Sequence, residues 1–350
     1  MAHRNDQHKR ATMTDVAREA GVSLKTVSRV INEVTTVDPQ LAAKVHQAVE
    51  KLGYRQNFAA ATLRSGNTTS TIGLVIKDLR NEFYATIASA VAEVAHRYGY
   101  QLVISHSGEN TDAEMNAVAD LCRRRIDGLL IVPTSGGSPG LKREMELGTP
   151  MVFIDRRPDN LIADAVVIDN FEGTRAGVGQ LIDSGHHRIA VLVDTLKMST
   201  MKERLRGAQQ AFTDRDLRLD DRLIVHDVAT PEAAAKAAKA LLKSANAPTA
   251  FFCGNNRSGI GVLQELWASN MGHPLVCFDD FSLSELMPRP FTAIGYDIGA
   301  LGRQGAELLI RRIQGEDFGT TSIVVPTDLR NRGISPHSQL TTESSEETFD

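Results

Sequence analysis

The sequence predicts an all-α headpiece followed by an α/β core of two doubly wound parallel-sheet lobes. Two observations carry this prediction. Residues 12–52 hold three short stretches with apolar side chains at helical spacing, whereas from residue 71 onward short apolar runs alternate with helical patterns. That alternation is typical of parallel strands with helices packed on both faces. With 350 residues, of which 42% are hydrophobic, the chain is long enough for more than one core.

The first two predicted helices form a helix-turn-helix. The first begins at Thr12–Asp15, which offers an N-cap hydroxyl and a carboxylate three residues later, and it ends at Gly21. Ser23 can cap the second helix, in which Val27 and Val30 recur at helical spacing. The opposite face then suits a recognition helix in the major groove of DNA. Its residues are Leu24, Lys25, Thr26, Ser28, Arg29 and Asn32.

The third predicted helix begins at Asp38 and ends at Gly53. Pro39 stands at its first position, where a missing N–H costs nothing. A three-helix module without any ligand would show the same patterning, so periodicity alone does not establish DNA binding. The expected buried stripe of this helix is Leu41, Val45, Val49 and Leu52.

The residues themselves carry a resemblance. The stretches Thr14–Ser23, Thr26–Asn32 and Leu52–Asn57 closely resemble the DNA-binding headpiece of the LacI/GalR family of bacterial transcription regulators. The resemblance implies that residues 57–64 form a hinge helix on DNA and that Leu63 enters the minor groove as an apolar wedge. Together these arguments give as DNA-contact candidates Thr12, Thr14, Ser23, Leu24, Lys25, Thr26, Ser28, Arg29, Asn32, Tyr54, Asn57, Ala60, Leu63 and Arg64.

Charge is divided unevenly along the chain. The formal net charge of -4 is unusual for a nucleic-acid-binding protein, but residues 1–66 carry ten Lys and Arg against six Asp and Glu, a net of +4, which leaves -8 for the remainder. A basic end is the electrostatic footprint expected for phosphates, and an acidic remainder stays off them.

Cysteine usage and hydropathy indicate the compartment. Cys122, Cys253 and Cys277 are far apart, odd in number and without metal-ligand spacing, which favours buried thiols in a reducing compartment. The N-terminus lacks the apolar stretch of a signal peptide, and no segment approaches about 18 uninterrupted apolar residues. We therefore expect a cytoplasmic, nucleoid-associated protein with no membrane segment, metal or cofactor. The Gly136–Gly140 loop matches a hydrolase motif through its composition alone, so no enzyme activity is predicted.

The core is expected to contain two series of buried strands and their helices. The first series is Ile72–Ile76, Gln101–Ser105, Gly128–Val132 and Met151–Ile154, and the second is Ile189–Val193, Ala250–Cys253 and Leu275–Phe278. The accompanying helices are Phe83–Tyr98, Phe171–Ser184, Thr200–Asp214, Pro231–Ser244 and Ser258–Ala268. The single Trp267 is expected to lie in the core.

Over residues 71–335 the core resembles the family's effector domain, which has the fold of type I periplasmic sugar-binding proteins. The resemblance implies three crossings between the lobes, near Asp169, Asp297 and Val324. The expected boundaries are 1–11, a disordered extension; 12–56, the helix-turn-helix domain; 57–64, the hinge; 65–70, a linker; about 71–168 and 297–323, the N-lobe; about 169–296 and 324–335, the C-lobe; and 336–350, a disordered acidic tail.

Ligands of such sheets bind outside the carboxyl ends of the strands. From strand-end positions and from the resemblance, the effector-binding candidates are Phe83, Tyr84, Asp155, Arg204, Asn255 and Asp279. Acids and amides beside an aromatic face suit a sugar or polyol. A lone Asp at a strand end can instead be a helix N-cap. Asn256 and Glu82 depart from the Asp and Pro that are common at these positions in the family.

These observations predict a homodimeric transcription repressor. Dimerisation follows because one recognition helix reads too few base pairs, whereas a two-fold dimer on a palindromic operator doubles the contact. A sugar or polyol would release the operator, and assembly into a tetramer stays open. Two alternatives remain: a regulator that needs a corepressor, either a purine or a phosphoprotein, and a soluble small-molecule sensor without a DNA function.

Overall fold

The computed structural model describes residues 11–32, 34, 36–55, 69–137 and 139–333. It divides into two compact units, Met1–Thr69 and Ser70–Asp350, each of which is described by itself. The predicted hinge at 57–64, with the candidates Asn57, Ala60, Leu63 and Arg64, lies outside the described residues, as do the outer parts of both predicted terminal extensions.

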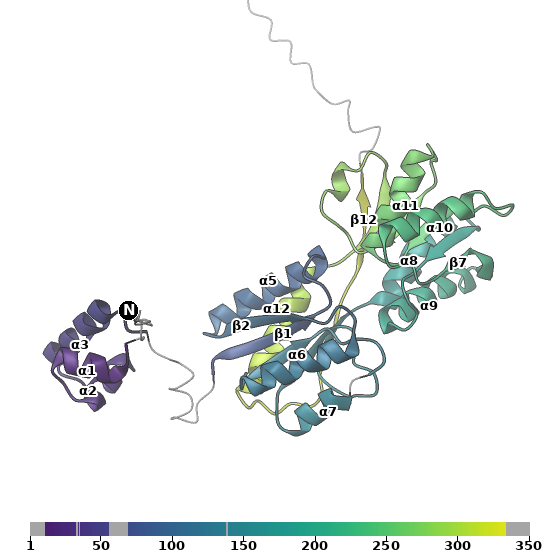
Figure 1. The fold of residues 1–350 in the computed structure, drawn as a ribbon. Helices are drawn as coiled ribbons and strands as arrows, with labels where there is room; N and C mark the ends of the chain where they lie inside the picture. The colour runs from purple at the N-terminus through teal and green to yellow at the C-terminus, as the bar shows by residue number, and fades with distance from the viewer. Residues whose placement is uncertain (1–10, 33, 35, 56–68, 138, 334–350) are drawn as a thin grey trace, which may run out of the picture. The chain divides into compact units, whose positions relative to one another are not determined.

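The first unit contains the three expected helices, α1 (Met13–Ala20), α2 (Leu24–Ile31) and α3 (Pro39–Leu52) (Figure 1). Thr12 begins α1 with a capping box, because its hydroxyl accepts the Asp15 N–H while its own N–H donates to the Asp15 carboxylate. The core of this unit is Val16, Ala17, Val27, Val30, Val45 and Ala48.

One residue of the predicted stripe is misplaced. Leu41 is 37% exposed, because it lies in the first turn of α3, outside the stripe that starts at Val45 and packs on α1 and α2.

The second unit contains two six-stranded sheets, as the fold class predicted. In the N-lobe the strand order is β11-β5-β4-β3-β1-β2. Every pair in this sheet is parallel. Its strands are β1 (Thr71–Ile76), β2 (Gln101–His106), β3 (Gly128–Ile131), β4 (Met151–Asp155), β5 (Ala165–Ile168) and β11 (Ser322–Val325). Helices α5 (Glu82–Arg97) and α12 (Ile298–Ile313) cover one face, and α6 (Thr111–Arg123) and α7 (Pro139–Glu146) cover the other.

The C-lobe repeats this arrangement with the order β12-β10-β9-β8-β6-β7, in which only β12 is antiparallel to its neighbour. Its strands are β6 (Ile189–Leu192), β7 (Ile224–Val225), β8 (Ala250–Cys253), β9 (Leu275–Phe278), β10 (Phe291–Gly295) and β12 (Asp328–Arg332). Helices α8 (Asn170–Asp183) and α9 (Ser199–Thr213) cover one face, and α10 (Pro231–Leu242) and α11 (Asn256–Ala268) cover the other. Two short 3-10 turns, η1 (Asp221–Leu223) and η2 (Ser284–Leu286), complete the lobe.

The chain crosses between the lobes three times. It passes from β5 into α8, from β10 into α12, and from β11 into β12. The third crossing is at 326–327, two residues after Val324, because Val324 and Val325 still pair with Val167 and Ile168 of β5.

Three further expectations need correction. Strand β2 is not buried on both faces, because it lies at the edge of its sheet, where Val103 and Ile104 are 37% and 39% exposed. Trp267 is 57% exposed near the end of α11 rather than in the core. Cys122 is only partly buried, whereas Cys253 and Cys277 are buried as expected. No helix in the described parts of the chain is long and apolar enough to cross a membrane.

Candidate functional site

The described DNA-contact candidates of the first unit lie largely at its surface. Thr12, Thr14, Ser23, Leu24, Lys25, Arg29 and Asn32 are exposed, while Thr26, Ser28 and Tyr54 are partly buried. Helix α2 holds five of these ten candidates, and Ser23 caps it: the Thr26 N–H donates to the Ser23 hydroxyl over 3.1 Å. The predicted outward face of α2 is therefore present in the structure.

The two cations of this face differ. The Arg29 guanidinium donates to the Thr36 hydroxyl over 2.5 Å, which fixes its direction. Within the described parts of the chain, Lys25 makes no hydrogen bond or ion pair, so its ammonium is free to meet a phosphate or a base edge.

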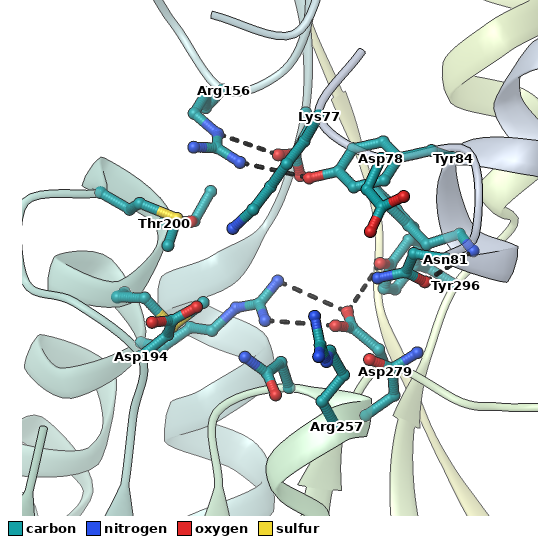
Figure 2. Close-up of a pocket in the computed structure, with 17 residues that line it drawn as sticks. Lys77, Asp78, Asn81, Tyr84, Arg156, Asp194, Thr200, Arg257, Asp279 and Tyr296 are labelled. Carbon is teal, nitrogen blue, oxygen red and sulfur yellow. Dashed lines mark hydrogen bonds and ion pairs between the residues drawn. The ribbon is translucent and has the colours of Figure 1, made fainter. Parts of the chain in front are cut away.

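The second unit contains an open cavity of about 630 Å³ between its lobes. All six effector candidates line it: Phe83, Tyr84, Asp155, Arg204, Asn255 and Asp279 (Figure 2). They come together because the carboxyl ends of both sheets face the cavity, which is where strands β4, β8 and β9 end.

A buried ion pair forms the C-lobe wall of the cavity. Arg204 of α9 is 3% exposed and contacts both oxygens of Asp279 at 3.5 Å. Its guanidinium also donates to the Asn170 side chain over 2.8 Å and to the Gly254 carbonyl, and it stacks on the Phe278 ring. Because all of these partners lie within the protein, Arg204 is oriented before any ligand arrives.

Close helix packing places Arg204. Three residues after it, Gly207 faces α8, and a Cβ atom at this position would lie 2.4 Å from the Phe171 carbonyl oxygen. Only glycine allows α8 and α9 to approach this closely. The spacing of three residues between Arg204 and Gly207 therefore has a packing cause.

Tyr296, in the second crossing, completes the C-lobe pair. Its hydroxyl donates to Asp279 over 2.7 Å. Burial, together with the charge of Asp279, raises the pKa of Tyr296 well above its ordinary value, so the hydroxyl keeps its proton.

A second buried pair forms the N-lobe wall. The Arg156 guanidinium is 5% exposed and donates to Asp155 over 3.0 Å, to Glu109 over 3.0 Å and to the Tyr84 hydroxyl oxygen over 3.4 Å. Burial raises the pKa of Tyr84, which therefore stays neutral in this setting.

The structure shows which of the strand-end residues Asp155, Asn255 and Asp279 are helix N-caps. Asn255 is a helix cap as well as a wall residue, because its side-chain oxygen accepts the Ser258 N–H over 2.9 Å at the start of α11. Asp155 and Asp279 cap no helix and have φ of 72° and 68°. Left-handed backbone is uncommon for residues other than glycine and gathers at functional sites. The cap interpretation therefore holds for Asn255 and fails for both aspartates.

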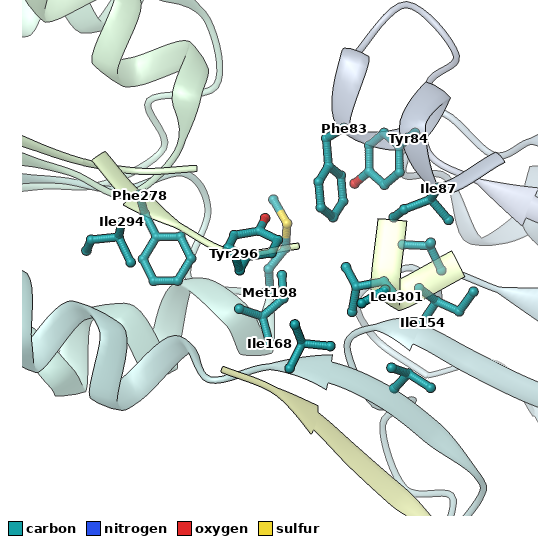
Figure 3. Packing of buried hydrophobic residues seen from close by; sticks show 14 of the residues in the cluster. Phe83, Tyr84, Ile87, Ile154, Ile168, Met198, Phe278, Ile294, Tyr296 and Leu301 are labelled. Carbon is teal, nitrogen blue, oxygen red and sulfur yellow. The ribbon is translucent and has the colours of Figure 1, made fainter. Parts of the chain in front are cut away.

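A cluster of buried apolar side chains packs beside these polar walls (Figure 3). The Tyr296 ring lies 6.4 Å from the Phe83 ring of the N-lobe and 6.1 Å from the Phe278 ring of the C-lobe, measured between centroids. All three belong to one buried cluster that runs through both lobes. Tyr296 therefore joins the apolar packing of the lobes as well as their polar contacts.

A hydrogen-bonded contact also joins the lobes at the cavity mouth. The Glu82 carboxylate, at the start of α5, accepts the Ser282 N–H over 3.2 Å and the Ser282 hydroxyl. Glu82 belongs to the N-lobe, whereas Ser282 follows β9 of the C-lobe. The departure noted at position 82 therefore has a structural role.

Several cavity residues were not among the predicted effector candidates. They are Lys77, Asp78, Asn81, Arg156, Asp194, Met198, Thr200, Met201, Asn256, Arg257 and Tyr296. Lys77, Arg156 and Asp194 come within two residues of the ends of β1, β4 and β6, so the strand-end rule could have found them. Tyr296 directly follows β10, a strand that was not predicted, and Met198 has no such signal. Among the described residues, no group of three or more His, Cys, Asp and Glu side chains is placed to hold a metal ion.

Two family models match the chain. The family described as "Bacterial regulatory proteins, lacI family" matches residues 12–57, and "Periplasmic binding proteins and sugar binding domain of LacI family" matches residues 69–332. Similar proteins include catabolite control protein A of Priestia megaterium, 30% identical over 90% of this chain and 96% of that protein. The HTH-type transcriptional repressor PurR of Vibrio atlanticus is 29% identical over 88% of this chain and 93% of that protein.

Solved structures of transcription regulators are also similar to this chain. The lac repressor dimer bound to operator and the anti-inducer ONPF has a TM-score of 0.82 and 26% identity, and the match covers 93% of this chain and 99% of that one. The complex of the transcriptional regulator CelR with cellobiose has a TM-score of 0.68 and 29% identity, covering 92% and 98% of the two chains.

Proposed function

Since the chain belongs to the LacI family of bacterial transcription regulators, we propose that it represses transcription from a palindromic operator and leaves that operator when a small hydroxylated molecule enters the cavity. Members of this family bind operator DNA and small-molecule effectors, form dimers and are not enzymes. What supports an effector site is that the six candidates come from both lobes yet line a single cavity.

The lobes supply the switch. A ligand held between them favours one relative arrangement of the lobes only if it contacts both, and residues of both lobes line this cavity. In a dimer, a change in lobe arrangement alters the separation of the two hinge segments, and hinges that cannot pair lose the minor groove. Effector and operator binding then oppose each other through a shared equilibrium.

The headpiece supplies sequence recognition. We assign Lys25 and Arg29 to guanine or phosphate contacts, and Thr26 and Ser28 to backbone or thymine contacts. Leu24 and Lys25 occupy the positions at which family members vary their operator choice. Insertion of Leu63 into the minor groove remains a prediction, and it implies that Leu63→Ala weakens operator binding more than binding to random DNA.

The effector is assigned to the sugars or polyols. Asp194 and Asn255 offer a carboxylate and an amide for hydroxyl groups, and Phe83 offers an aromatic face. The relative named CelR was solved with cellobiose, which agrees with this class.

The test begins by selecting the operator from random duplexes with the full-length protein. We expect a palindrome whose affinity falls steeply with salt, since phosphate contacts release counterions. Sugars and polyols are then added to the complex. Release of the operator in an anisotropy titration supports the proposal. Tighter binding on addition would instead identify a corepressor, and the absence of salt-dependent DNA binding would remove the regulator function.

A further inference from the structure

We propose that the molecule bound in the cavity carries a negatively charged phosphate or carboxylate group beside its hydroxyls, and that Lys77, Arg257 and Thr200 receive this group. The inference rests on the proposed function, because it takes the cavity to be the effector site. It narrows the effector from sugars and polyols in general to sugar phosphates and sugar acids.

The acids of the cavity do not call for a cationic ligand. Arginines already hold three of the four: Arg80 binds Asp78, Arg156 binds Asp155, and Arg204 binds Asp279. Hydrogen bonds from Arg80 lower the pKa of Asp78 to about 2. The fourth acid, Asp194, is buried and accepts the Thr195 N–H over 2.7 Å, which leaves its second oxygen for a ligand hydroxyl.

Two further cations of the cavity, Lys77 and Arg257, are held less tightly than these arginines. The Lys77 ammonium forms a long ion pair, 3.6 Å from Oε2 of Glu109, which is beyond ordinary hydrogen-bond length. Among the described residues, Arg257 makes no hydrogen bond or ion pair; its charge acts on Asp78 and Glu232 only as a longer-range attraction. Both side chains therefore keep N–H donors for a ligand.

The two cations reach the cavity from opposite lobes. Lys77 directly follows β1 of the N-lobe, and Arg257 lies in the first turn of α11 of the C-lobe. Figure 2 shows both side chains directed into the same space. One anionic group bound by both would join the lobes through charge-assisted bonds. The position of the cations thus suits a ligand that favours closed lobes.

Thr200 adds a neutral donor to the wall of the same cavity. It is 4% exposed and lines the cavity, yet its hydroxyl makes no hydrogen bond within the described ranges. Thr200 is the second residue of α9, and the N-cap of that helix, Met198, has no side chain that can accept from the first-turn N–H groups. A buried hydroxyl and uncapped N–H groups together favour an anion.

A neutral sugar would satisfy these groups less well. It would occupy Asp194 and Asn255, but it would leave the exposed Arg257 guanidinium without an anionic partner and the Lys77 ammonium with only its long contact to Glu109. A ligand with hydroxyls at one end and an anion at the other satisfies both sets.

The experiment compares ligands that differ only in charge, using the full-length protein. The sets are glucose, glucose 6-phosphate and gluconate; and ribose, ribose 5-phosphate and ribonate; inorganic phosphate alone is a further probe. Calorimetry should show that a charged member binds at least about tenfold tighter than its neutral parent. The phosphate and carboxylate arms identify which anion is used.

Substitutions test whether Lys77 and Arg257 cause the preference for a charged ligand. Lys77→Gln and Arg257→Gln should each weaken the charged ligand about tenfold while leaving the affinity of the neutral parent nearly unchanged. Lys239→Gln, an exposed lysine on α10, is the matched control and should leave both affinities unchanged. Melting curves without ligand verify that the variants fold.

Two results would overturn the inference. One is a neutral parent that binds as tightly as its charged partner, or variants that bind the charged ligand normally; the proposed function would then stand with a neutral effector. The other is a charged panel, phosphate included, that does not bind at all. Failure of the proposed function is distinct, because it appears as loss of salt-dependent operator binding.

Discussion

The N-lobe and the C-lobe each present a buried aspartate with positive φ at the end of a central strand, but they hold it differently. Asp155 pairs with Arg156, the next residue in the chain. Asp279 pairs with Arg204, which comes from another element, and with Tyr296 of the second crossing. Arg204 also holds Asn170, which follows the first crossing. The C-lobe network therefore touches two of the three crossings, and the N-lobe network touches none.

This difference suggests different roles for the Arg204–Asp279 pair of the C-lobe and the Arg156–Asp155 pair of the N-lobe. A change in lobe arrangement must bend the crossings, and Asn170 and Tyr296 lie at them, so it must disturb the contacts of Arg204. The Arg156 network stays within the N-lobe and can remain intact. We infer that the C-lobe wall responds to lobe arrangement, whereas the N-lobe wall mainly shapes the cavity.

The largest expected effect comes from Arg204→Ala. It leaves Asp279 buried without its cation, which should lower the free energy of unfolding by about 3 to 5 kcal/mol and abolish the effector response. Urea titration of the full chain measures the first and operator anisotropy the second. Arg206→Ala is the control on the same helix, because Arg206 is exposed, pairs with Glu203 and lies 5.3 Å from the centroid of the Phe171 ring; it should change stability by less than about 1 kcal/mol. Equal effects would contradict the special place of Arg204.

The second-largest effect is expected from Gly207→Ala. The new Cβ would meet the Phe171 carbonyl oxygen at 2.4 Å, so α9 must move and carry Arg204 with it. We expect a loss of about 1 to 3 kcal/mol in unfolding free energy, together with a weaker effector response.

The N-lobe offers a matched substitution. Gly302→Ala would meet the Ile87 carbonyl oxygen at 2.6 Å between α12 and α5, and it should destabilise similarly while perturbing the effector response less. Gly319→Ala, which meets nothing within 4 Å, is the neutral control. A response lost equally in Gly302→Ala and Gly207→Ala would remove the distinction between the lobes.

Tyr296→Phe should have a smaller effect. It removes a 2.7 Å hydrogen bond to Asp279, which should cost about 1 to 2 kcal/mol of unfolding free energy. Because the pKa of Tyr296 is raised by burial, the hydroxyl stays protonated and the loss should be the same at pH 6 and pH 9. Tyr84→Phe removes only the 3.4 Å contact from Arg156 and should cost less. A larger loss from Tyr84→Phe would reverse the comparison.

Features that depend on residues close together in the sequence could be predicted, whereas contacts between residues far apart in the sequence could not. Helix ends in the headpiece were visible because Thr12, Ser23 and Asp38 cap helices through bonds to residues at most three positions away. Strand ends could also be predicted, because short apolar runs mark them in the sequence. The interaction partners of the site residues could not be predicted: nothing in the sequence pairs Arg204 with Asp279, because topology alone brings α9 to the end of β9.

The sequence also does not indicate which strand lies at the edge of a sheet. The apolar run of β2 has the composition of a buried strand, yet Ile104 is exposed because β2 ends the sheet. Trp267 likewise lies outside the core, although a large aromatic side chain favours burial, because it projects from the outer face of α11 while the adjacent Leu266 is 2% exposed in the core. Both errors concern which surfaces face a neighbour in the folded protein.

The smallest effect on stability, and the sharpest test of lobe coupling, is expected at Glu82. Its bonds to Ser282 join residues 200 positions apart, but Glu82 is exposed, so Glu82→Ala should lower the free energy of unfolding by less than about 1 kcal/mol. The lobes should nevertheless open more readily, which increases the radius of gyration of the ligand-free protein in X-ray scattering. Ser282→Ala should reproduce this, and the double variant should add little, since both remove the same contact. Glu93→Ala, an exposed acid on the same helix, is the control. Additive effects of the two variants would show that Glu82 and Ser282 do not hold the lobes together.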